Sequence, residues 1–255
     1  MLKHRVIPCL LLRNGGLVKT QKFADPKYVG DPINAIRIFN EKEVDELLVL
    51  DIEASKLGQE PYYDLIEEFA SECFMPLTYG GGVASVEQAR RLFSIGVEKV
   101  SIQTSVLSDL KLVSDITSLY GNQSVVVALD IKKNLLGQYK LYSSATGKVQ
   151  GRDWHEFIKM AVDVGAGEIL LSAVDRDGML NGMDLPLIKQ AVSVCTVPLI
   201  AVGGIGCLAD IKEAVNAGAN AVAAGAFFIY HGPHRAVLIT YPKYQELVEL
   251  LETIK

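Results

Sequence analysis

The feature that most constrains this fold is an eightfold alternation of short apolar segments with stretches of helical periodicity. The apolar segments are rich in Val, Ile and Leu, and a Gly-, Asp-, Asn- or Ser-rich turn follows each of them. Because their apolar character is nearly continuous, both faces of each strand should be covered, as in a parallel sheet surrounded by helices. The expected strands are residues 6–12, 46–52, 75–79, 99–103, 125–131, 168–173, 199–202 and 221–224.

The second half of the chain repeats the pattern of the first. Residues 76–83 (PLTYGGGV) lead into a helical stretch that ends in SIGV, and residues 198–205 (PLIAVGGI) lead into one that ends in NAGA. Two halves of four strand–helix units in 255 residues predict a (β/α)8 TIM barrel made of two similar half-barrels. We expect one domain over residues 1–255. The clearest helices are predicted at 64–72, 85–94, 154–164 and 208–216.

Composition excludes several classes of function. A net charge of -5 argues against a general nucleic-acid binder, and the apolar run that ends at Arg13 is too short to span a membrane. Four cysteines lie far apart, without CxxC spacing or histidines at ligand distance, so we expect reduced core cysteines and no metal site. The prediction is a cytoplasmic protein without a cofactor.

Two glycine pairs, Gly81-Gly82 and Gly203-Gly204, leave predicted strands directly into helices. Glycine lets the backbone approach an anion closely, and the amides at a helix N-terminus supply positive charge. About 20 residues after each pair, Gln103-Thr104 and Ala224-Gly225 end strands that could close an anion cradle. We therefore predict two phosphate sites at opposite ends of one substrate. The alternative is that each pair forms only a tight turn.

Asp130 ends an otherwise apolar strand. A partly desolvated carboxylate at the barrel mouth has a raised pKa and suits general acid/base chemistry, although it could instead hold backbone amides. Asp51 and Asp175 end strands in the same way and are expected to position ligands or loops. The counterpart of Asp130 in the first half is Leu11, which cannot transfer a proton.

The sequence resembles the cyclase subunit of imidazole glycerol phosphate synthase over nearly its whole length. The resemblance is carried by residues 7–10, 18–19, 51, 79–82, 99–102, 127–130, 165–171, 175–178 and 203–204. It implies substrate binding by Lys19, Asp51, Asp175, Asp177 and Gly178, in addition to the two glycine cradles. It also implies that Arg5, Glu46, Lys99 and Glu168 form a gate for ammonia at the N-terminal face of the barrel. Since the chain has no Gly-x-Cys-x-Gly nucleophile elbow, a separate glutaminase subunit is implied at that face.

Three departures from the family affect the substrate side. Its cyclases use two aspartates, and Leu11 stands at one of those positions. Gln103 replaces an asparagine, and Val202 replaces a phosphate-binding serine. Residues 7–12, 27–43 and 231–242 resemble a divergent branch associated with surface-polysaccharide genes. There, the barrel and its glutaminase are thought to supply ammonia to a third protein that converts an acetamido sugar into an acetamidino sugar.

The expected function is therefore ammonia-dependent glycosyl amidation, with a phosphorylated or nucleotide-sugar small molecule as ligand. Three alternatives remain open. They are an authentic cyclase of histidine biosynthesis, a sugar-phosphate isomerase with the same half-barrel symmetry, and a non-catalytic conduit or scaffold for ammonia.

Overall fold

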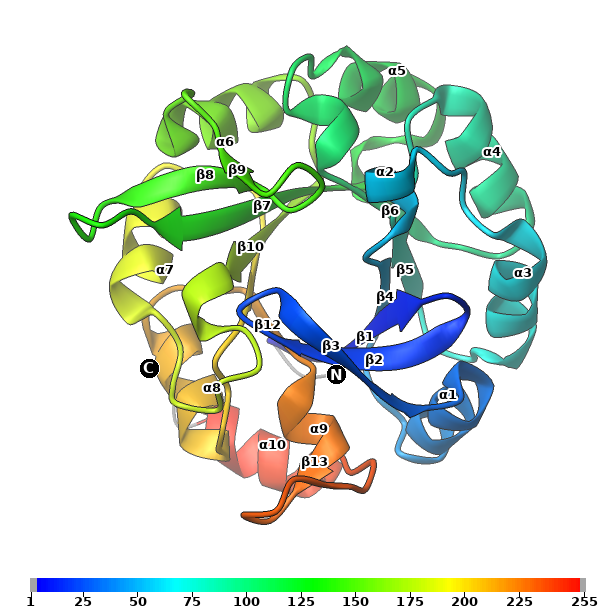
Figure 1. The fold of residues 1–255 in the computed structure, drawn as a ribbon, viewed down its shortest axis with the longest axis vertical. Helices are drawn as coiled ribbons and strands as arrows, with labels where there is room; N and C mark the ends of the chain where they lie inside the picture. Colours follow the sequence, from blue (N-terminus) through cyan, green and yellow to red (C-terminus); the bar gives the residue numbers. More distant parts are fainter. Residues whose placement is uncertain (1–3, 253–255) are drawn as a thin grey trace.

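In a computed structural model, which describes residues 4–252, eight parallel strands close into a barrel (Figure 1). β12 pairs with β1, and β7 pairs with β10, so the ring has no open edge. The barrel strands are β1 (Arg5–Arg13), β4 (Leu47–Asp51), β5 (Leu77–Gly80), β6 (Lys99–Ile102), β7 (Val125–Lys133), β10 (Glu168–Ala173), β11 (Leu199–Val202) and β12 (Ala221–Ala224). The predicted (β/α)8 barrel is confirmed, and most of the expected strand boundaries agree within two residues.

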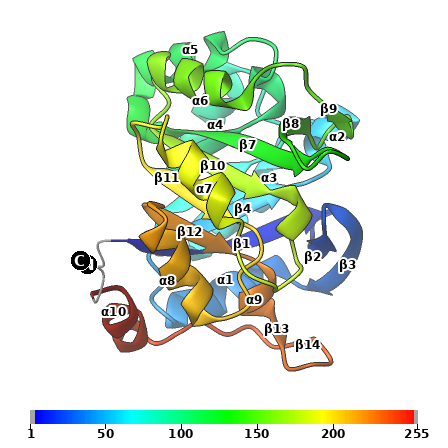
Figure 2. The ribbon, with the colours of Figure 1, turned by 90° about the vertical axis from the view of Figure 1, so that its left-hand side faces the viewer.

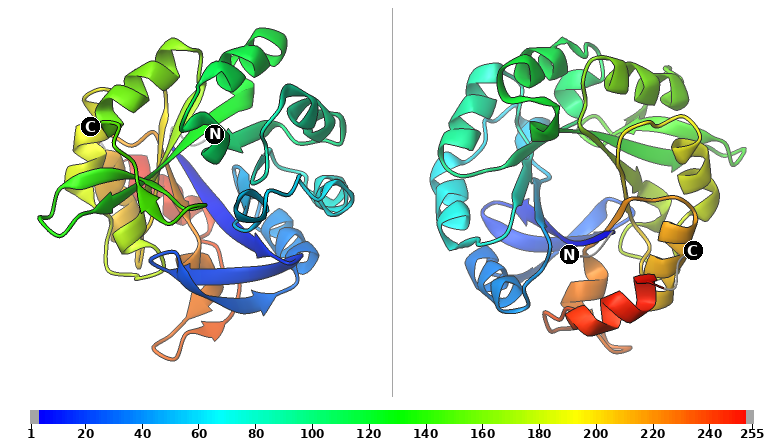
Figure 3. Two further views of the ribbon diagram at one scale, coloured as in Figure 1. Left: turned by 45° about the horizontal axis from the view of Figure 1, so that its top comes forward. Right: turned by 180° about the vertical axis from the view of Figure 1, so that it is seen from behind.

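Helices surround the barrel on the outside (Figure 3). The longer ones are α1 (Pro32–Glu41), α3 (Tyr63–Glu72), α4 (Val86–Ser94), α5 (Lys111–Tyr120), α6 (Trp154–Asp163), α7 (Leu185–Val192), α8 (Leu208–Asn216) and α10 (Tyr244–Glu252), with short α2 (Ala54–Leu57) and α9 (Ala226–Ile229). Their starts follow from side-chain caps. Ser85 accepts the Gln88 amide at the start of α4, and Asp153 accepts the His155 and Glu156 amides at α6. Single 3₁₀ turns lie at Thr104–Val106, Asn122–Ser124 and Val174–Arg176.

Each half-barrel also carries antiparallel strands that extend its first barrel strand, which the sequence pattern did not predict. β2 (Gly16–Gln21) and β3 (Ala24–Gly30) follow β1, and β8 (Tyr139–Ser143) and β9 (Lys148–Val149) follow β7. These strands gather on the C-terminal side of the barrel, at the right of Figure 2. A small hairpin, β13 (Tyr230–His231) with β14 (Ala236–Val237), lies in the stretch after α9.

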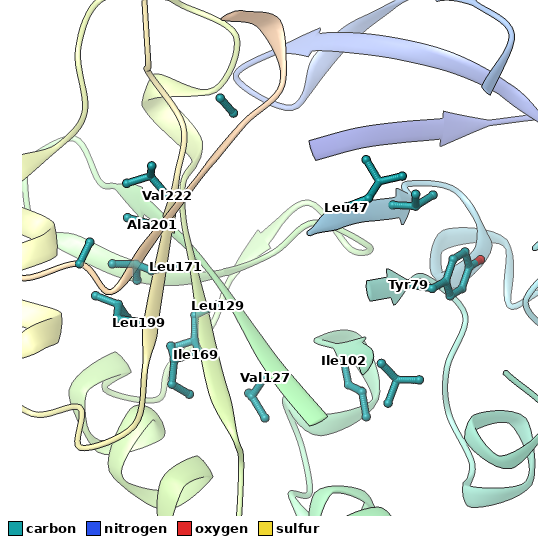
Figure 4. Close-up of a cluster of buried hydrophobic side chains, with 14 of the residues drawn as sticks. Leu47, Tyr79, Ile102, Val127, Leu129, Ile169, Leu171, Leu199, Ala201 and Val222 are labelled. Carbon is teal, nitrogen blue, oxygen red and sulfur yellow. The ribbon is translucent and has the colours of Figure 1, made fainter. Parts of the chain in front are cut away.

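The core has two layers that follow from the alternation of side chains along each strand. Outward-facing residues such as Leu47, Ile102 and Val127 belong to the larger cluster between strands and helices (Figure 4). A smaller cluster fills the barrel and includes Ile7 and Ala128. The strands are therefore covered on both faces, which explains their nearly continuous apolar sequences.

Two further expectations concern the cysteines and membranes. All four cysteines are free, but only Cys9 is buried, and Cys207 is exposed at the start of α8, so the prediction that all four are core residues is wrong. None of the helices within residues 4–252 combines the length and apolarity that crossing a bilayer requires.

Candidate active site

A cavity opens at the C-terminal ends of the barrel strands. The space inside it that a water molecule can reach is about 150 Å³. Side chains from both halves line it, and the β2–β3 and β8–β9 segments add Phe23 and Ser144. The cavity therefore lies at the end of the barrel where such folds carry their chemistry.

Asp130 projects into this cavity from β7 and is only 6% exposed. Its carboxylate accepts a hydrogen bond from the Gln103 side-chain amide, whose oxygen in turn accepts one from Ser144 Oγ at 3.0 Å. Burial raises the pKa of Asp130 to about 6, against the opposing effect of hydrogen bonds from Gln103, Ser172 and Ser144. A carboxyl group with such a pKa can both donate and accept a proton near neutral pH.

Strand register places Leu11 at the position equivalent to Asp130. Asp130 pairs with Tyr142 of the β8 extension and with Ser172 of the next barrel strand, and Leu11 makes the matching pairs with Val18 and Leu50. Both residues line the cavity. At this position of the repeat, the cavity wall thus carries a carboxylate in the second half and an apolar side chain in the first.

The first predicted phosphate cradle is only partly assembled. Gly81, Gln103 and Thr104 line the cavity, and Gly81 has φ 121° with its would-be Cβ only 2.5 Å from the Asp51 carbonyl oxygen. Gly82 is buried, and its amide already donates to Ser55 Oγ at 3.1 Å. The Asp51 carboxylate lines the cavity but accepts the amides of residues 53 and 54, so it also holds the start of α2.

The second predicted cradle forms a smaller pocket that shares a wall with the main cavity. Its lining includes Lys19, Asp177, Gly178, Gly203, Gly204, Ala224 and Gly225. Lys19 is 4% exposed and its Nζ donates to the Cys9 carbonyl at 2.6 Å, while burial lowers its pKa. A Cβ at Gly225 would lie 2.6 Å from that nitrogen, so glycine is needed there for Lys19 to reach its position.

The loop after β10 separates the roles of Asp175 and Asp177. Asp177 accepts Thr20 Oγ1 at 2.6 Å and the Phe23 amide at 3.2 Å, and burial raises its pKa. It faces both pockets. Asp175 lines neither pocket and instead accepts the Lys133 amide at 2.8 Å, so it holds the end of β7 next to the β7–β8 turn.

Four charged residues meet at the opposite, N-terminal end of the barrel. Arg5 contacts both Glu46 and Glu168, the latter at 2.8 Å. Lys99 contacts the same two carboxylates, at 3.1 and 2.9 Å. Although burial favours the neutral acid, Arg5 and Lys99 hold the pKa of Glu168 below its usual range. The sequence prediction named these four residues, which we call the basal ring, but did not include Thr78, which donates to Glu46 at 2.7 Å.

Sequence reasoning also missed the hydroxyl groups around Asp130. Ser172 could have been found, because it continues the inward-facing series Glu168, Leu170 along an apolar strand. Ser144 could not, since the β8 segment that presents it was not predicted. Within residues 4–252, no cluster of three or more His, Cys, Asp or Glu side chains is arranged to hold a metal ion.

Comparison with known proteins agrees with this architecture. Residues 5–234 match the family described as histidine biosynthesis protein. A *Pseudomonas aeruginosa* relative, provisionally named imidazole glycerol phosphate synthase subunit hisF2, is 52% identical over 97% of this chain and 99% of its own length. A *Vibrio vulnificus* relative provisionally named subunit hisF3 is 49% identical over 99% and 98%.

A relative from *Exiguobacterium sibiricum*, named imidazole glycerol phosphate synthase subunit HisF without reservation, is 40% identical over 89% of this chain and 91% of its own length. Among these three relatives, the one with the unreserved name is the more distant. The family match and these identities over nearly the whole chain agree with the closed barrel and its basal ring. The chain therefore belongs to the histidine biosynthesis protein family, among the imidazole glycerol phosphate synthase subunits of the HisF type.

Proposed function

We propose that this barrel receives ammonia from a separate glutaminase subunit at its N-terminal face and supports an amidation at its C-terminal face. The observation that carries the proposal is the arrangement of the basal ring and Asp130 at opposite ends of one barrel. The ring would control entry of ammonia, and Asp130, with its pKa of about 6, would move a proton at the site where ammonia reacts.

We further propose that the ammonia acceptor is an acetamido sugar rather than the histidine intermediate. In this reaction the amide carbonyl carbon forms a bond to the nitrogen of ammonia and loses its oxygen. The oxygen leaves on a phosphoryl group of a nucleoside triphosphate, the co-reactant that the third, sugar-amidating protein would supply. Leu11 supports this proposal because it removes one of the two carboxylates that a cyclase of this family would use. Gln103 and Val202 support it because both change the walls of the substrate cavity.

The alternative function is an authentic cyclase of histidine biosynthesis. It is favoured by Asp130, which remains buried and protonatable, and by the glycine cradle around Gly203 and Gly204. The cyclase reaction requires a carboxylate at position 11, whereas the proposed amidation does not. Substitutions of Leu11 therefore distinguish the two functions.

The first experiment measures imidazole formation from the ribonucleotide substrate of the histidine pathway, with the purified barrel and high ammonium. We expect turnover roughly 10²- to 10⁴-fold below that of a two-aspartate cyclase, because one proton-transfer group is missing. Leu11→Asp should raise the rate, whereas Leu11→Asn should not. Robust imidazole formation by the unmodified protein would overturn the assignment to amidation and establish the cyclase.

The second experiment tests the glutaminase partner by pull-down and gel filtration against each glutaminase encoded in the source genome. One of them should form a complex, and charge reversal by Lys99→Glu at the basal ring should weaken it. The control is Lys148→Glu, because Lys148 is exposed on β9, which lies on the C-terminal side of the barrel (Figure 2). Absence of any complex would count decisively against ammonia transfer.

A further inference from the structure

The β7–β8 hairpin and the β9 segment that follows it are strongly basic in an acidic protein. Residues 131–152 contain five lysines or arginines and no aspartate or glutamate, although the whole chain has a net charge of -5. This hairpin begins at Asp130 and extends from the mouth of the cavity (Figure 1). Lys132, Lys133 and Lys140 therefore follow Asp130 along the strand pair that leaves the cavity, although none of the three lines it.

The two faces of the hairpin differ in how their charges are compensated. On one face, Lys133 Nζ lies 3.0 Å from Asp184, and the Tyr139 ring packs edge-on against Trp154. On the other face, Lys132 lies directly opposite Lys140, two pairs beyond Asp130 and Tyr142. Like charges directly opposite each other destabilise a strand pair. The carboxylates that approach this hairpin, those of Asp175 and Asp184, are both used at Lys133.

The internal repeat shows that this cation could have been neutralised. Arg13 occupies the position in the first half that Lys132 occupies in the second, two residues beyond Leu11 as Lys132 is two beyond Asp130. Arg13 forms an ion pair with Glu53 at 2.6 Å. The residue that corresponds to Glu53 is Asp175, which binds the Lys133 backbone amide instead. Within residues 4–252, Arg13 is thus paired with a carboxylate, whereas Lys132 forms no ion pair.

The ammonium group of Lys132 is nevertheless oriented. Its Nζ lies 4.9 Å from the centre of the Tyr142 ring, a cation–π geometry that places the charge beside the strand pair leading to Asp130. The Tyr142 carbonyl oxygen lies 3.4 Å from the Gln103 amide that contacts Asp130. Tyr142 thus connects the lysine pair to the polar network of the cavity.

We propose that Lys132 and Lys140 form a subsite for the phosphoryl groups of the ligand, at the rim of the cavity and outside the two glycine cradles. The subsite takes a phosphate or diphosphate whose attached sugar reaches toward Asp130. Two adjacent ammonium groups suit a diphosphate because each contributes a point charge with several donors. This inference deepens the proposed function by placing the anionic part of a phosphorylated sugar or nucleotide sugar, and it requires neither ammonia nor the glutaminase.

The experiment titrates the free barrel with inorganic pyrophosphate, inorganic phosphate and uridine diphosphate while following the ring signals of ¹³C-labelled tyrosine by NMR. The Tyr142 signal is identified by its loss in Tyr142→Phe. We expect pyrophosphate and uridine diphosphate to shift this signal in a saturable way, with an affinity that falls as salt rises. Phosphate should bind more weakly, because it spans the two ammonium groups less well.

The double variant Lys132→Gln/Lys140→Gln should weaken pyrophosphate binding at least about tenfold and abolish the Tyr142 shift. Lys159→Gln on α6 is the control for the loss of one positive charge. It should change neither the affinity for pyrophosphate nor the shift of the Tyr142 signal. A Tyr142 signal that does not move with any of the three anions would overturn the subsite, as would equal binding by the double variant. If Lys132 and Lys140 bind an acidic protein instead, none of the three anions will shift the Tyr142 signal. The results of the glutaminase pull-down and of the cyclase assay do not depend on this outcome.

Discussion

Asp130 is held by neutral partners. Gln103, Ser172 and Ser144 provide hydrogen bonds to the carboxylate, but they do not offset the cost of burying its charge, so its pKa rises to about 6. In an unfolded chain an aspartate titrates near 3.9. The folded protein therefore binds an additional proton at Asp130 between these two values, and the contribution of this group to stability falls as pH rises from about 4 to about 6, then stays level.

This linkage predicts the effect of Asp130→Asn, which keeps the shape of the side chain and removes the charge. Relative to the unmodified protein, the variant should gain up to about 3 kcal/mol of unfolding free energy between pH 4 and pH 8, since each pKa unit corresponds to about 1.4 kcal/mol. Urea unfolding of both proteins at a series of pH values measures this difference. A difference that does not change with pH would show that Asp130 is ionised without penalty.

At the scale of elements, the loop after β10 is fixed against the β2–β3 hairpin. Thr20 and Phe23 bind the Asp177 carboxylate, and the Lys22 amide donates to the Asp177 carbonyl oxygen at 2.9 Å. Gly178 follows at φ 66°, and a Cβ there would lie 2.0 Å from the Thr20 carbonyl oxygen. This contact joins elements from the two half-barrels at the wall of the second cradle.

Gly178→Ala should therefore open this contact. Gly58 provides a matched control, because it has nearly the same φ, 64°, but no atom within 4 Å of a Cβ. Gly58→Ala should cost about 1 kcal/mol for the left-handed backbone alone, and Gly178→Ala roughly 1–3 kcal/mol more for the collision. Thermal unfolding of the two variants tests this expectation. Equal losses would mean that the loop shifts to accommodate the methyl group.

Which elements could be predicted follows from what stabilises them. The strands of the barrel are buried on both faces, so their apolar sequences revealed them. β3 reads Ala-Asp-Pro-Lys-Tyr-Val-Gly and is mostly exposed. Backbone pairing with β2 holds it in place, and the turn between the two strands has Lys22 and Phe23 at positive φ. Neither the pairing nor the turn produces an apolar pattern in the sequence. The same limit applied to the site: the repeat identified Asp130 and Leu11, whereas Ser144 depends on an unpredicted strand.

At the scale of the molecule, the basal ring joins the two half-barrels. Arg5 and Glu46 come from β1 and the residue before β4, Lys99 from β6 and Glu168 from β10. Glu46 is 2% exposed and compensates both cations from the first half. A closed ring of this kind stabilises the barrel and must rearrange if ammonia passes through it, so stability and the proposed transfer depend on the same contacts.

Glu46→Gln should accordingly destabilise the whole barrel, because it leaves Arg5 and Lys99 with one carboxylate between them. Breaking a buried ion pair typically costs about 3–5 kcal/mol, and the partial exposure of Arg5 places the expectation near the lower value. The matched control is Glu72→Gln, which breaks an ion pair with Arg37 at 2.7 Å on the exposed surface and should have a much smaller effect, because solvent screens the two charges. Urea unfolding at neutral pH compares the two. Similar small losses would show that the ring contributes little to closing the barrel and can open at low cost, which would favour a role in passage over one in stability.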